Sequence, residues 1–96
     1  MILSKNNNLK DHSKCTTRHI LAVNITYLRH KMGLSQEELA EKSGRSISLI
    51  SDIENENISA TVDAIDDIGL ALGWTTSDLT KDNGFVVTKK RVDSRQ

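Results

Sequence analysis

The sequence predicts an all-α fold, a bundle of five short helices. The 96 residues leave room for one domain and not for two. The chain contains no proline and one residue each of Phe, Tyr and Trp, so Leu, Ile, Ala and Val carry most of the burial. These apolar residues recur every three or four positions, as they do along one face of a helix. Most of the apolar segments follow a Ser or Thr and precede a Gly, which is typical of helix ends.

The first helix is expected over residues 18–32. Thr17 is its predicted N-cap, and Gly33 marks its end because glycine readily adopts the left-handed backbone that closes a helix. The apolar residues fall at spacings of four, three and four and form one stripe: Leu21, Ile25, Leu28 and Met32. Residues 1–16 have few apolar side chains and several lysines, which predicts a flexible basic arm.

Two further helices are expected within residues 36–55. Ser35 is the N-cap of the first of them, and Glu38 three residues later completes a capping box. Gly44 ends that helix, and Ser46 is a good N-cap for the next.

Packing between these two helices is predicted from four apolar residues. Ile50 and Ile53 recur at helical spacing and point back at Leu39 and Ala40. The small side chain of Ala40 lets the helices cross closely at a steep angle. A steep crossing joined by a short turn that contains glycine is the helix-turn-helix arrangement.

Thr61 is expected to cap a fourth helix that ends at Gly73. The predicted buried stripe of this helix consists of Val62, Ile65, Ile68 and Leu72. Leu70 lies off that stripe. Trp74 is expected to cover the end of the core, ahead of a short fifth helix over residues 77–79.

Residues 81–96 form a predicted C-terminal extension beyond the domain at residues 17–80. A turn signal, Asp82-Asn83-Gly84, precedes an apolar, β-prone run over residues 85–88 and then a basic run. The extension is either an extra strand or a tail that becomes ordered only on binding. Because so small a core has no room left for Phe85 to Val87, we expect this run and Leu70 to form a homodimer contact.

Charge is unevenly distributed although the formal net charge is zero. Between Arg18 and Thr80 there are five Lys and Arg against ten Asp and Glu, whereas the two flanks hold eight against three. The globule is therefore acidic and the flanks are basic. Two interpretations stay open: the flanks are ordinary solvated tails, or they bind the phosphates that the globule repels.

The segment from Leu28 to Gly44, LRHKMGLSQEELAEKSG, resembles the phage-repressor family of Cro and XRE-type helix-turn-helix proteins. The matching positions are Gln36, Ala40, Gly44, Ile50 and Ile53, and the similarity extends to about Leu79. The resemblance implies a five-helix, lambda-repressor-like bundle that binds double-stranded DNA.

The same resemblance implies which residues would meet DNA. The third helix would enter the major groove with four base-facing residues, Ile47, Ser48, Ser51 and Asp52. Gln36 would contact a phosphate and brace that helix, and other phosphates would be held by Arg45 or Ser46 and by backbone amides near Asn55. A bidentate bridge between Arg29 and Glu54 would fix the angle of the recognition helix.

These features predict a sequence-specific transcriptional regulator, a repressor that binds a palindromic operator as a homodimer. The alternative is an antitoxin or other protein-interaction module, with a toxin as partner, in which DNA binding is secondary. The acidic globule and the apolar run from Phe85 to Val87 favour the alternative. The outer face of the recognition helix has no Lys or Arg, which weakens the case for DNA binding.

Catalysis, metal binding and a membrane span are not predicted. His12, Cys15 and His19 are spaced as on one helix face, but a zinc site needs more ligands. A single cysteine cannot form an internal disulfide and indicates a reducing cytoplasm. No apolar run approaches the length of a membrane span. We therefore expect a cytoplasmic protein that is not an enzyme and has no cofactor.

Overall fold

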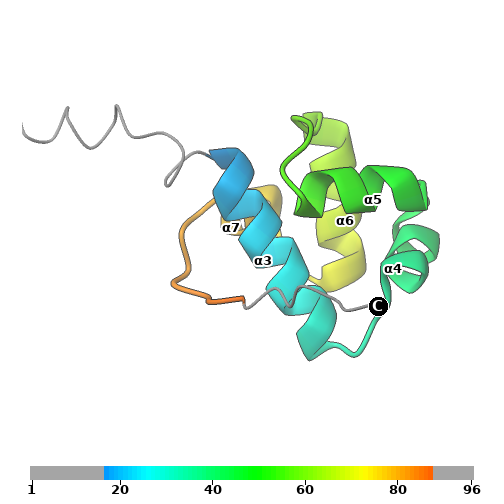
Figure 1. Cartoon of the computed structure of the whole chain (residues 1–96), viewed down its shortest axis with the longest axis horizontal. Coiled ribbons are helices and arrows are strands. Elements are labelled where there is room, and N and C mark those ends of the chain that lie inside the picture. Colours follow the sequence, from blue (N-terminus) through cyan, green and yellow to red (C-terminus); the bar gives the residue numbers. More distant parts are fainter. Residues whose placement is uncertain (1–16, 88–96) are drawn as a thin grey trace, which may run out of the picture.

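A computed structural model of the chain describes residues 17–87, which form five helices and no strand (Figure 1). The helices are α3 (Thr17–Lys31), α4 (Gln36–Ser43), α5 (Ile47–Glu54), α6 (Val62–Leu72) and α7 (Thr76–Leu79). The all-α, five-helix prediction is confirmed, with boundaries within one residue of those expected. The predicted arm, residues 1–16, and the end of the extension, residues 88–96, lie outside the described residues.

Side-chain caps set the beginnings of four helices, because each capping oxygen accepts a hydrogen bond from a backbone amide that the helix leaves without a partner. The capping residues are Ser35, Ser46, Thr61 and Thr75. At α4 the predicted capping box is complete. The Ser35 hydroxyl accepts from the amide of Glu38 at 3.0 Å, and the Glu38 carboxylate accepts from the amide of Ser35 at 2.8 Å.

The helices enclose one small core. The helix α4 contacts both α5 and α6, α3 contacts α5 and α7, and α6 contacts α7. In Figure 1, α5 lies across the face of the bundle in front of α6. Every helix contributes fully buried aliphatic side chains to this core, and their packing fixes α5 against its neighbours. These side chains are Ile25, Leu39, Ile50, Ile53, Ile68 and Leu79. The predicted packing of Ile50 and Ile53 with Leu39 and Ala40 belongs to this core.

Two apolar residues predicted to be buried are exposed instead. Met32 is 45% exposed because α3 ends at Lys31 and the chain turns away. Val62 is 65% exposed because it is the first residue of α6 and lies at the edge of the buried face formed by Ala64, Ile65, Ile68 and Leu72. Hydrophobic periodicity predicted which face of each helix is buried, but it did not predict which residues at the helix ends are exposed.

The first part of the extension packs on the bundle, so the expectation that the core had no room for Phe85 is wrong. The Phe85 ring stacks on Tyr27 of α3, with centroids 3.9 Å apart and an angle of 14° between the ring planes, and lies 5.9 Å from Trp74. The buried Asn24 amide donates to the carbonyl oxygens of Leu79 and Lys81 at 2.6 and 2.9 Å. These contacts hold residues 80–85 against α3.

Of the helices between residues 17 and 87, none is both long enough and apolar enough to span a lipid bilayer.

Candidate nucleic-acid interface

The turn between α4 and α5 sets the direction of α5. Gly44 adopts a left-handed conformation with φ 73°, and its amide donates to the carbonyl oxygens of α4. The amide of Arg45 donates to Ala40 O at 3.0 Å, and Ser46 then caps α5 through the amide of Leu49 at 3.1 Å. A side chain at Gly44 would be strained by this backbone, since residues with a Cβ rarely adopt positive φ.

One side of α5 faces the core and the other faces outward. Ile50 and Ile53 are buried, whereas Ile47 is 47% exposed and Ser48 is also exposed. Ser51 and Asp52 follow one turn later on the same side and are half-buried. The four residues predicted to face bases therefore lie together on the accessible side of the helix.

The C-terminal end of α5 is held by a network around Glu54, whose side chain is 5% exposed. The Arg29 guanidinium donates from Nε to Oε2 at 2.7 Å and from Nη2 to Oε1 at 3.0 Å, and the Gln36 amide donates to Oε1 at 3.0 Å. Arg29 also donates from Nη1 to Leu34 O at 2.8 Å. The predicted bidentate geometry between Arg29 and Glu54 is therefore present. Gln36 contacts the same carboxylate, and its predicted phosphate contact stays a prediction.

Arg45, predicted to hold a phosphate, is paired within the chain. Its Nε and Nη2 atoms donate to Oδ2 of Asp67 on α6, at 3.0 and 2.7 Å. This pair ties the turn between α4 and α5 to α6. A phosphate would have to compete with Asp67, so a DNA contact by Arg45 stays a prediction.

The backbone amides near Asn55 are also engaged. Asn55 and Glu56 donate to carbonyl oxygens of α5, and Asn57 donates to Asp52 O at 2.9 Å. Because these amides close the end of the helix, a phosphate cannot use them as predicted without opening it. The exposed Asn55 side chain, which donates to Ser51 Oγ at 3.3 Å, is still accessible for such a contact.

Comparison with known proteins agrees with this geometry. Residues 25–79, more than half of the chain, match the family model described as helix-turn-helix. The chain belongs to the XRE-type helix-turn-helix family. No curated protein sequence gives a match.

Two solved structures resemble this helix-turn-helix domain. A hypothetical transcription factor, NHTF, from Neisseria is 30% identical, with a TM-score of 0.66 over 69% of this chain and 76% of that one. The clp gene regulator ClgR from Corynebacterium glutamicum is 25% identical, with a TM-score of 0.61 over 66% of this chain and 67% of that one. The family and the fold therefore rest on both sequence and structure.

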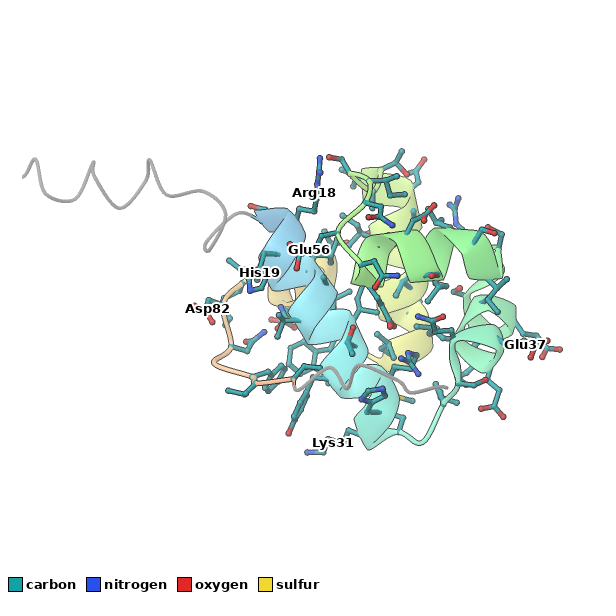
Figure 2. All side chains as sticks on the ribbon, in the orientation of Figure 1. Arg18, His19, Lys31, Glu37, Glu56 and Asp82 are labelled. Atoms are coloured by element: carbon teal, nitrogen blue, oxygen red, sulfur yellow. The ribbon has the colours of Figure 1, made fainter. Side chains whose placement is uncertain are left out.

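Two residues of the helix-turn-helix domain that sequence reasoning did not assign contact the loop after the recognition helix. On the first turn of α3, Arg18 donates from Nη2 to Ser59 Oγ at 2.6 Å, and His19 Nδ1 lies 2.8 Å from Oε2 of Glu56 (Figure 2). Glu56 has φ 63°, the one non-glycine residue with positive φ among those described. No local pattern could have indicated these pairs, since 41 and 37 residues separate their members.

Proposed function

We propose that this protein is a sequence-specific DNA-binding transcriptional regulator, a repressor that binds a palindromic operator as a homodimer. The observation that carries the proposal is the placement of α5. The Arg29–Glu54–Gln36 network fixes its C-terminal end, while Ile47 and Ser48 at its N-terminal end stay exposed. A rigidly held helix with an accessible first turn is suited to insertion into the major groove. A DNA target also implies the cytoplasm.

The outward side chains of α5 have defined base preferences. Ile47 would contact the methyl group of thymine, and Asp52 would accept a hydrogen bond from the amino group of cytosine. Ser48 and Ser51 can donate or accept, so they fit several bases. Gln36, Arg45, Ser46 and Asn55 would contact phosphates, which position the helix without reading sequence.

Selection of DNA duplexes from a random library, at a fixed salt concentration, tests this function. We expect a palindromic consensus whose half-sites lie about one helical turn apart. The Ser48→Ala/Ser51→Ala variant should lose about 1 kcal/mol of preference for the selected site over a mismatched one. Ser77→Ala, which removes an exposed hydroxyl on α7, is the matched control and should leave the preference unchanged.

Two exposed apolar residues support a homodimer. Leu70 on α6 and Val86 in the extension are each 80% exposed, and apolar side chains left in water commonly mark a contact surface. Light scattering at tens of micromolar should give the mass of a dimer, and Leu70→Lys should give a monomer. Val62→Lys, at the other end of α6 and also exposed, is the control that should stay dimeric.

A protein-interaction module, such as an antitoxin, is the second candidate. It is favoured by the acidic character of the bundle and by α5 itself, which contains Asp52 and Glu54 but no Lys or Arg. If the selection returns no duplex at low salt, and a toxin-like reading frame lies beside the gene, this second function replaces the first.

A further inference from the structure

The loop over residues 55–61 leads directly out of the recognition helix and lies against the first turn of α3. In Figure 2, Arg18, His19 and Glu56 gather at this end of α3. Two side-chain contacts join the segments, Arg18 to Ser59 at 2.6 Å and His19 to Glu56 at 2.8 Å. The first turn of α3 is thereby fixed beside the C-terminal end of α5.

Arg18 differs from the other arginines between residues 17 and 87 in what balances its charge. Arg29 is paired with Glu54 and Arg45 with Asp67, both carboxylates. Arg18 donates instead to a neutral hydroxyl, that of Ser59, and no carboxylate in the described part of the chain forms an ion pair with it. The guanidinium is exposed and carries five N–H donors, so most of its hydrogen-bonding capacity faces solvent.

The loop beside Arg18 has donors but no positive charge of its own. Residues 55–61 contain no Lys or Arg. The amides of Ile58, Ser59 and Ala60 donate no hydrogen bond within residues 17–87, unlike those of residues 55–57. Amide donors next to a guanidinium that has no carboxylate partner among residues 17–87 make a surface suited to an anion.

The one acidic side chain of this loop is turned toward α3. The left-handed conformation of Glu56 directs its carboxylate to His19 Nδ1. That contact holds the negative charge on the α3 side of the loop, where it is partnered by the imidazole. A phosphate approaching Ser59 and Arg18 therefore meets less repulsion than the composition of the loop suggests.

We infer that Arg18 is a phosphate contact of the DNA complex, acting with the loop amides of residues 58–60. The inference rests on the proposed function. With the start of α5 in the major groove, the loop at the other end of α5 and the first turn of α3 beside it would lie toward the sugar–phosphate backbone that flanks the groove. Arg18 would thus provide the basic contact that neither α5 nor the following loop contains.

Fluorescence anisotropy of the full chain with a selected duplex and a scrambled duplex, across a series of salt concentrations, tests the inference. Arg18→Ala should weaken binding to both duplexes by a similar factor, about five-fold at 0.15 M salt, and reduce the slope of log affinity against log salt by about 0.9. Arg18→Lys should retain most of the slope. Lys31→Ala removes the same charge from the far end of α3, where Nζ lies 5.9 Å from the centre of the Tyr27 ring, and should leave the slope unchanged.

The possible outcomes distinguish a failure of the Arg18 contact from a failure of the proposed DNA-binding function. If the wild type binds DNA and Arg18→Ala keeps the full salt slope with an unchanged melting temperature, Arg18 is not a phosphate contact and the proposed function stands. If Arg18→Ala and Lys31→Ala reduce the slope equally, the effect is one of overall charge and the inference is wrong. If the wild type binds neither duplex, the proposed function fails and the inference fails with it.

Discussion

Two arginine–carboxylate pairs join separate segments of this domain, and they differ in the burial of their side chains rather than in their N–O distance. Both Arg29–Glu54 and Arg45–Asp67 have a shortest N–O distance of 2.7 Å. The side chains of the first pair are 11% and 5% exposed, whereas those of the second are 31% and 44% exposed. The first pair lies at the base of the recognition helix, and the second ties the turn ahead of that helix to α6.

Because the two pairs differ in burial, breaking them should cost the domain different amounts of stability. Breaking a buried pair leaves a buried charge without its oppositely charged partner, which costs far more than the intact pair contributes. An exposed pair exchanges its partner for water and for ions of the solution, so its loss costs little. The position of the recognition helix therefore depends on Arg29 and Glu54 much more than on Arg45 and Asp67.

The largest expected effect is that of Arg29→Ala. It removes two hydrogen bonds to the buried Glu54 carboxylate and one to Leu34 O, and should lower the free energy of unfolding by about 3 kcal/mol in urea titrations. DNA affinity should fall with it, because α5 loses its anchor.

A double variant gives the control for this prediction. Arg29→Met/Glu54→Met removes both charges, so it should be less destabilised than Arg29→Ala alone. Equal losses in the two variants would mean that Glu54 reaches solvent once Arg29 is gone, and the contrast between the two pairs would then be wrong.

Gln36→Ala should have an intermediate effect. It removes one charge-assisted hydrogen bond to Glu54 but leaves the arginine, so we expect a loss of about 1 to 2 kcal/mol in the same titrations. Glu37→Ala, at the exposed neighbouring position of α4, is the control and should be nearly neutral. A Gln36→Ala protein as stable as the control would show that the hydrogen bond from Gln36 to Glu54 does not contribute to stability.

Asp67→Ala should have the smallest effect on stability, below about 1 kcal/mol after screening by solvent. Its effect on DNA binding should be opposite in sign to that of Arg29→Ala. Without Asp67 the Arg45 guanidinium can pair with a phosphate instead, so affinity at low salt should rise. Comparison with Arg45→Ala, which should bind more weakly than the wild type, checks this. If Asp67→Ala binds no better than the wild type, Arg45 does not reach the DNA.

Sequence reasoning predicted the parts of the fold that depend on local signals. The caps at Ser35 and Ser46, the stop at Gly44 and the face of each helix follow from side chains within a few residues of one another. The Arg29–Glu54 pair was predicted through the family resemblance, since the two residues are 25 positions apart.

Contacts that join distant segments were not predicted, because periodicity carries no information about which loop meets which helix. Neither the pairing of Arg45 with Asp67 nor that of Arg18 with Ser59 has a local signature. The need for glycine at Gly69 was likewise not foreseen. A Cβ at that position would lie 2.4 Å from the carbonyl oxygen of Trp74, where the chain doubles back from α6 toward α7.

The stacking of Phe85 on Tyr27 beside Trp74 has a consequence for spectroscopy. The chain contains one Trp, one Tyr and one Phe, so the rings of all three residues meet at this one place. Tryptophan emission therefore reports on the attachment of residues 80–85 to α3, whereas far-ultraviolet circular dichroism reports on the five helices. Coincident unfolding curves from the two signals would indicate that the segment detaches together with the bundle. An earlier fluorescence transition would indicate that it detaches first, and its amplitude would measure that step separately from the melting of the recognition helix.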